Sequence, residues 1–241
     1  MVYNICKYIK LKGKAMSYKT DLHCHNAEVS DCANAYSDLV AEKYIREGYT
    51  TVVLTNHLSE KTFIKHPELD TWDKKITFFM SGFEAMQRAS RGKFTVLFAA
   101  EVRMKENRND YLVYGITEAF LRDNPNILDI SIKELSAFCR KNGFLLVQAH
   151  PFRDDMRIVK PTLLDGMEVY NAQSSRAPRN DIAFQWASRY NLIMTSGSDH
   201  HDPDDVLSAG IRTAFPITNM DMLVRVLKSR SYELIREAYT F

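Results

Sequence analysis

The chain has 241 residues, of which 45% are hydrophobic and 26% are charged, as in an ordinary soluble globular protein. Lysine and arginine number 32 against 30 aspartates and glutamates, a formal net charge of +2, and this balance argues against a strongly basic nucleic-acid-binding domain. A chain of this length buries enough surface to fold without disulfides, and a barrel of this length is routinely one domain.

The cysteines and the chain start bear on cellular context. Cys6, Cys24, Cys32 and Cys139 form no C-x-x-C pair and no disulfide-like pattern, so we expect a reducing cytoplasm. No apolar run reaches the ~18 residues of a membrane span, so we expect no membrane partner. Residues 1–15 lack the uninterrupted apolar segment of a signal peptide. We predict that they are an N-terminal extension and that residues 16–241 form a single domain.

Predicted strands and helices alternate along the chain. The strands are predicted at Tyr18–His25, Thr50–Thr55, Phe94–Glu101, Asp110–Ile116, Phe144–Ala149, Gly166–Tyr170, Leu192–Ser196 and Tyr232–Ile235. The helices are predicted at Ser37–Glu47, Thr71–Ser90, Ile132–Lys141, Arg179–Tyr190 and Met220–Ser229. This rhythm is typical of βαβ units and a parallel sheet, and seven or eight such strands indicate an α/β barrel.

Polar residues with metal-binding chemistry follow the predicted strands. The first strand ends in D-L-H-C-H, where alternation places His23 and His25 on one face and Cys24 on the other. The other residues at strand ends are His57 in T-N-H, Glu101 in A-A-E, His150 in Q-A-H, and Asp199 and His201 in S-D-H-H. A lone H-x-H could be a solvated polar pair, but five strands that deliver His, Asp or Glu to one barrel rim indicate a metal site.

The ordered set D-L-H-C-H, L-T-N-H, A-A-E, Q-A-H-P-F-R, G-M-E-V-Y-N and S-G-S-D-H-H resembles the polymerase and histidinol phosphatase (PHP) family. The resemblance runs from about Tyr18 to the C-terminus. It implies a distorted, TIM-like (β/α)7 barrel with a parallel sheet and two or three divalent metals at its C-terminal rim. It also implies hydrolysis of phosphoesters.

The resemblance also implies a ligand set. His23, His25, Glu101 and Asp199 look like the ligands of one metal. Glu101 would bridge to a second metal, which takes His150, while His57 and His201 look like ligands of a third. A partner for the third metal is expected from the loop after H-x-H, where the alternatives are Glu28 and Asp31.

Three departures from the family pattern stand out. Asn56 replaces the aspartate of the frequent T-D-H. Asp31 follows Ser30 as in the family's S-D-G, but Cys32 replaces the glycine. No histidine occurs between Lys105 and Ala149, where many relatives supply a ligand, so Asp110, Tyr111 or water would have to substitute.

Other polar residues are candidates for catalysis or support. Arg153, three residues beyond His150, is the first choice for a phosphate clamp because its planar fork matches phosphate oxygens. Arg176 and Arg179 are second choices, and the alternative for each is a solvated surface charge. His200 is a candidate proton donor, although alternation could turn it away. Glu168 is expected either to orient ligands or to have a paired structural role.

The sequence therefore predicts a hydrolase that acts on a small phosphorylated substrate, with Zn²⁺, Mn²⁺ or Fe²⁺ as the metal. One alternative is a nuclease on the same site, which the balanced charge disfavours. Another is a metal-binding regulatory domain with weak catalysis, which the missing second-site histidine keeps open. The oligomeric state is not predicted.

Overall fold

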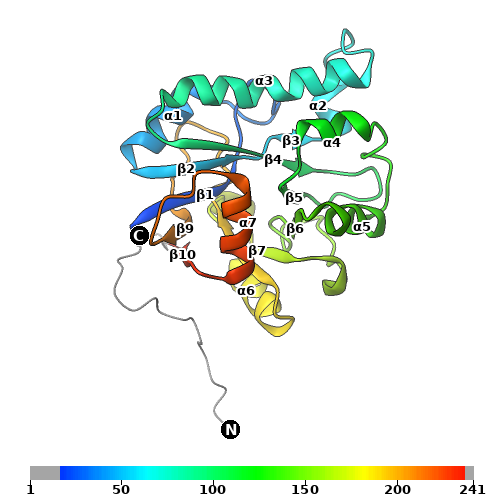
Figure 1. The fold of residues 1–241 in the computed structure, drawn as a ribbon. Helices are drawn as coiled ribbons and strands as arrows, with labels where there is room; N and C mark the ends of the chain where they lie inside the picture. The colour runs from blue at the N-terminus through cyan, green and yellow to red at the C-terminus, as the bar shows by residue number, and fades with distance from the viewer. Residues whose placement is uncertain (1–16, 237–241) are drawn as a thin grey trace.

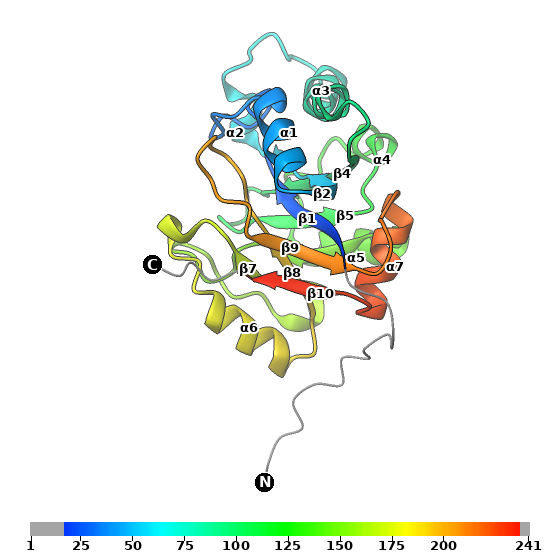
Figure 2. The same cartoon turned by 90° about the vertical axis from the view of Figure 1, so that its left-hand side faces the viewer.

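The strands form one sheet that curls into a nearly closed barrel, with helices around it (Figures 1 and 2). The computed structural model describes residues 17–236. Its strands are β1 (Tyr18–Cys24), β2 (Tyr49–Leu54), β3 (His57–Leu58), β4 (Thr95–Val102), β5 (Tyr111–Tyr114), β6 (Leu145–Gln148), β7 (Gly166–Asn171), β8 (Ile193–Gly197), β9 (Ala209–Thr213) and β10 (Glu233–Arg236).

The α-helices are α1 (Ser37–Arg46), α2 (Glu60–Ile64), α3 (Trp72–Ser90), α4 (Glu118–Asp123), α5 (Ile132–Asn142), α6 (Asn180–Arg189) and α7 (Met220–Ser229). Two short 3₁₀ turns, η1 (Pro161–Leu163) and η2 (Ser174–Arg176), precede and follow β7. Every predicted strand and helix is present, with ends shifted by one or two residues. The short elements β3, β9, α2 and α4 were not predicted, because each has too few residues for a clear periodicity.

The mixed α/β class and the barrel shape are confirmed, but the sheet is only partly parallel. The strand order is β10-β9-β1-β2-β4-β5-β6-β7-β8, with β3 paired to β4. β1, β2 and β4 run parallel, as do β6, β7 and β8, whereas β5, β9 and β10 run antiparallel to their neighbours. The loop from β4 to β5 is too short for the crossover helix that a parallel pair requires, so β5 turns back.

Side chains and main chain join the two ends of the strand order. The Ser196 hydroxyl on β8 donates to the carbonyl of Ile235 on β10 (2.6 Å) and accepts from the N–H of Gly210 on β9 (3.0 Å). Just beyond the C-terminal end of β8, the N–H of Asp199 donates to the carbonyl of His23 (2.8 Å). These bonds fix the segment after β8 against the end of β1, where the D-L-H-C-H motif lies.

Apolar clusters fill the space between the sheet and the helices. One joins α3, α4, α5 and α6 to the sheet, and a second joins α1 and α3 to β2. A third packs α7 against strands from both halves of the sheet. The apolar side chains of α3 lie in these clusters, with Phe79 and Met86 fully buried. The core thus holds the strand ends rigidly.

Within residues 17–236, the structure contains no helix of the length and apolar character needed to span a membrane. The predicted extension, residues 1–15, lies outside the described residues, and the single domain over residues 16–241 stays a prediction.

The close approach of β9 to β1 depends on Gly210, which has a φ of 120°. A Cβ at this position would lie 2.3 Å from the carbonyl oxygen of Thr20. We expect Gly210→Ala to lower the free energy of unfolding by about 2–4 kcal/mol, because overpacking and left-handed strain add together. Urea denaturation measures this loss.

Gly48→Ala is the matched control. Gly48 also has a positive φ, 71°, but an added Cβ would meet nothing within 4 Å, so only the conformational cost of about 1–2 kcal/mol is expected. Equal losses in the two variants would contradict the role of the Thr20 contact.

Candidate metal centre

The predicted strand ends meet in one buried cluster. β1 and the residue after it carry His23 and His25, β3 carries His57, and β4 carries Glu101. His150 follows β6, and Asp199 and His201 follow β8. All of these side chains are at most 2% exposed except His57, at 19%. The sequence placed these residues at a common rim, and the structure brings them together there.

The innermost group consists of His23, His25, Glu101 and Asp199. The Nε2 atoms of His23 and His25 lie 3.0 Å apart. Each of these nitrogens is 3.3–3.4 Å from a Glu101 oxygen and 3.3 Å from Asp199 Oδ1. Four side chains therefore direct nitrogen and oxygen ligand atoms into one small space.

A hydrogen bond fixes the protonation of the first imidazole. His23 Nδ1 lies 2.9 Å from Glu168 Oε1, and an ionised carboxylate can only accept. In the neutral ring that a metal ion requires, the proton is therefore on Nδ1 and the Nε2 lone pair faces His25 and the carboxylates. Lone pairs and carboxylate oxygens this close repel one another unless a cation lies between them.

The charges of the cluster shift its pKa values in the same sense. Burial opposes a charge on His23, but Asp199 and Glu101 outweigh burial and hold the pKa of His23 well above its usual range. Burial also opposes ionisation of the two carboxyls, yet the neighbouring cationic groups hold the pKa of Glu101 and of Asp199 well below its usual value. The site contains ionised carboxylates and attracts positive charge.

The second group lies on the other side of Glu101. His150 Nε2 is 3.0 Å from Glu101 Oε1 and 3.7 Å from Asp110 Oδ2. Asp110 thus stands where the sequence lacked a histidine, as one of the substitutes considered. Both Asp110 oxygens also accept from the Arg103 guanidinium, so its charge is already partly neutralised.

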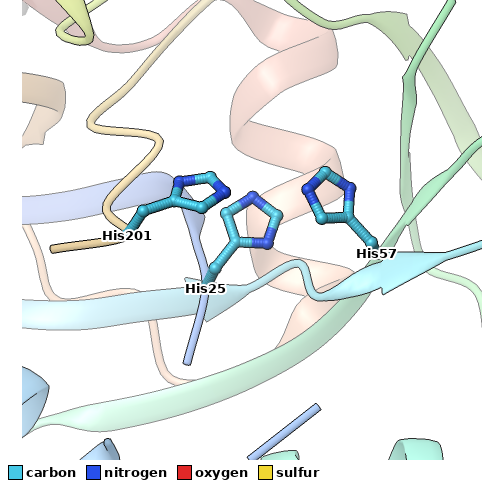
Figure 3. A group of neighbouring side chains, drawn as sticks. All are labelled: His25, His57 and His201. Carbon is cyan, nitrogen blue, oxygen red and sulfur yellow. The ribbon is translucent and has the colours of Figure 1, made fainter. Parts of the chain in front are cut away.

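The third group consists of His25, His57 and His201, whose rings face one another in Figure 3. One nitrogen from each lies within 4.8 Å of the others. His57 Nδ1 is 2.8 Å from Glu101 Oε2, so Glu101 touches imidazoles of every group. This central position is the one that the predicted bridging role of Glu101 requires.

The loop after β1 places the expected third-site carboxylates elsewhere. Both Glu28 oxygens accept from the Ser37 N–H at the start of α1 (3.0 and 3.3 Å). Asp31 pairs with Lys65 (3.0 Å). The side chain that reaches the histidines is Cys32, whose Sγ lies 3.1 Å from His201 Nε2. Burial opposes a negative charge on Cys32, but a hydrogen bond from His57 and the charge of that ring lower the pKa of the thiol.

The donor set fits divalent metals. Glu101 Oε2, Asp199 Oδ1 and His150 Nδ1 are buried and have no hydrogen-bond partner in the described part of the chain. Two of these are ionised oxygens with imidazole nitrogens 2.8–3.4 Å away. Such close contacts without hydrogen-bond geometry are expected where the atoms point at a common ion.

Several residues orient these groups without joining them. Glu168 Oε2 accepts from the His150 N–H and from the Asn171 side chain (both 2.9 Å), and Asn171 also donates to Asp199 Oδ2 (3.1 Å). Asn171 was not predicted as a site residue, although it ends the quoted G-M-E-V-Y-N motif. Asn56 donates to Asn26 (2.7 Å) and accepts from Ser30 (3.0 Å). It therefore ties the loop after β1 to the strand end before His57.

The predicted catalytic side chains lie apart from open solvent. Arg153 donates to Asp199 Oδ2 and to Asn171 Oδ1, and its side chain is only 10% exposed. His200 is fully buried beside Tyr44, with ring centroids 6.0 Å apart, and neither ring nitrogen has a partner within residues 17–236. Burial lowers the pKa of His200 to about 4. Neither role, phosphate clamp or proton donor, gains support from these positions.

Comparisons with known proteins agree with this architecture. Residues 177–232 match the profile of the family described as PHP-associated. Among curated protein sequences no match is found.

Solved structures share the fold at low sequence identity. One is a two-domain protein from Bacteroides vulgatus that contains a predicted PHP-like metal-dependent phosphoesterase (TM-score 0.66, 18% identity, 91% of this chain). This chain spans 65% of that protein's length. A second is a candidate metal-dependent phosphoesterase from Bifidobacterium adolescentis (TM-score 0.54, 16% identity, 92% of this chain and 99% of that one). A third is an amidohydrolase from Chromobacterium violaceum, solved with bound sulfate and no metal (TM-score 0.51, 18% identity, 91% and 98%).

The profile match covers the C-terminal part of the chain, and the solved structures show that the whole described chain shares its fold with PHP-like proteins. The clustered His, Glu and Asp side chains form groups that could hold metal ions.

The bridging position of Glu101 makes its loss more damaging than that of an ordinary ligand. Glu101→Gln removes the charge that faces three imidazole groups, so we expect the bound metal to fall by more than one ion equivalent. Mass spectrometric metal analysis measures this, with Glu84→Gln on the exposed face of α3 as the control. A full metal complement in Glu101→Gln would show that the carboxylate does not bridge.

Proposed function

We propose that the protein is a metal-dependent phosphoesterase that hydrolyses a small phosphorylated substrate. Two or three divalent ions, Zn²⁺, Mn²⁺ or Fe²⁺, suit the mixed imidazole and carboxylate donors. The observation that carries the proposal is the convergence of three donor groups on Glu101. Ions held there would act as Lewis acids toward a phosphoryl oxygen and an attacking water.

Other side chains of the chain position the metal ligands. Glu168 and Asn171 hold His23, His150 and Asp199 in register. Arg153 faces Asp199 and offsets its negative charge, which is a positioning role. Phosphate binding by Arg153 stays a prediction, and we consider a second cation near the rim beside it.

Arg176 is the best placed cation for this purpose. It is exposed in η2, and none of the described residues forms an ion pair with it. Its charge reaches His201, where after burial and the His57 ring it helps to lower the pKa of the imidazole. By contrast, the Arg179 guanidinium is engaged by Asp154 (2.7 Å). An unpaired guanidinium is free to bind phosphate oxygens in a bidentate manner.

The rival functions differ in substrate. A nuclease would need a basic, aromatic groove for the strand, and the net charge of +2 does not favour one. An amidohydrolase would not require Arg176. A regulatory domain would bind metal without turnover. The described cysteines Cys24, Cys32 and Cys139 are free, and we propose that the protein works in the cytoplasm.

The deciding experiment is turnover by the metal-loaded protein. We expect hydrolysis of p-nitrophenyl phosphate and of one member of a panel of phosphorylated metabolites, and loss of both after chelation. Turnover of single-stranded DNA alone, of an aryl amide alone, or of nothing would contradict the proposal in favour of the nuclease, amidohydrolase or regulatory alternative respectively.

Arg176→Ala tests the phosphate clamp. We expect kcat/KM for the phosphomonoester to fall by roughly 100-fold, the low end for loss of one charge-stabilising donor, with metal content unchanged. Arg189→Ala, at the far end of α6 and equally exposed, should leave kcat/KM unaltered. Equal kinetics in the two variants would exclude Arg176 as the clamp.

A further inference from the structure

Cys32 lies at the outer edge of the third group of histidines. It is the exposed cysteine among the described residues, whereas Cys24 and Cys139 are buried. Its Sγ is 3.1 Å from His201 Nε2. The residue before it is Asp31, one of the two third-site ligands that the family resemblance implied.

The hydrogen bonds of His201 determine what faces the sulfur. His201 Nδ1 lies 2.7 Å from the carbonyl oxygen of Asp199, and a carbonyl can only accept. The proton of the neutral ring is therefore on Nδ1, and Nε2 presents its lone pair to Cys32. His57 belongs to the same group, because one of its ring nitrogens lies within 4.8 Å of a nitrogen of His201.

The distance between nitrogen and sulfur is close to that of two ligands on one ion. Zn–S and Zn–N bonds at a tetrahedral angle place the two ligand atoms about 3.6 Å apart, so a shift of about half an ångström in the exposed loop would suffice. The competing carboxylates are already occupied: Asp31 by Lys65, and Glu28 by the N–H of Ser37. Among the described residues, the partners of the Cys32 thiol are the histidines themselves.

We propose that Cys32 binds the outermost divalent ion as a thiolate, together with His57 and His201. On binding, the Sγ–H bond breaks, the proton passes to solvent, and the sulfur lone pair forms the bond to the metal. A thiolate makes this outer site softer than the carboxylate-rich inner site. It should therefore select Zn²⁺, Cd²⁺ or Co²⁺ over Mn²⁺ or Mg²⁺. The inference rests on the proposed metal dependence, but not on the identity of the substrate.

Spectroscopy of metal binding tests the thiolate directly. The protein for the test is the full chain with Cys6→Ser, which removes the cysteine outside the described residues, stripped of metal and titrated with Co²⁺. We expect a near-ultraviolet thiolate-to-metal charge-transfer band that saturates at one ion equivalent. The band should be absent in Cys32→Ser and unchanged in Asp31→Ala, the adjacent exposed residue. Circular dichroism checks that both variants fold.

Two further measurements separate the possible outcomes. Bound Zn²⁺ should protect one thiol from Ellman's reagent, and Cys32→Asp should retain the outer ion while its preference shifts toward Mn²⁺. A band that persists in Cys32→Ser, or one lost only in Asp31→Ala, would overturn the assignment. Because these readouts need no substrate, absence of phosphatase activity together with a normal band would reject the proposed function and leave the thiolate site standing.

Discussion

The structure depends on two ionised carboxylates, Glu101 and Asp199, that are buried among imidazoles. Leaving one buried charge without a partner costs about 3–5 kcal/mol, so the surrounding elements must supply positive charge or donors. The strand ends converge on these two side chains from different parts of the sequence. The barrel can close around such a centre only when a cation compensates it.

Hydrogen bonds to acceptor-only oxygens determine which nitrogen of each imidazole ring carries the proton. Glu168 and the Asp199 carbonyl can only accept, so they hold protons on the Nδ1 atoms of His23 and His201. The Nε2 lone pairs are then directed inward, where metal ligands are needed. The backbone contributes as well, because Asp199 has a φ of 52°, in a region that aspartate tolerates better than most residues. This conformation allows its N–H to bond β1 while its side chain enters the site.

Local patterns in the sequence were sufficient for the strands and for the residues at their ends. Period-2 apolar runs followed by His, Glu or Asp marked where each strand stopped, and the barrel rim then gathered those residues. Strand direction was less accessible, because it depends on connection length and on long-range pairing: the chain after β4 has no helix and must reverse.

The loop after β1 could not be predicted from its own residues. Its path is set by distant contacts, including the N–H groups of Asn34 and Ala35, which donate to the carbonyl of His201. These bonds carry Cys32 past the position expected for Asp31, and a displacement of one residue exchanges an oxygen ligand for sulfur. Which arginines form ion pairs could not be predicted from the sequence either, because Arg153 donates to Asp199, a residue 46 positions away.

Differences in solvent exposure determine the side from which a substrate can approach the site. The inner ligands are at most 2% exposed, so a substrate cannot approach from their side. Solvent reaches the cluster at His57 and at Cys32. Arg176, which has no ion pair among residues 17–236, helps to lower the pKa of His201. A phosphate arriving there would meet a guanidinium and the outer ion before the inner ones. The inner carboxylate-rich group then serves as the fixed electrostatic base of the site. In the outer group, the proposed thiolate ligand Cys32 lies on an exposed loop, so we expect this metal to exchange more readily than the inner ones.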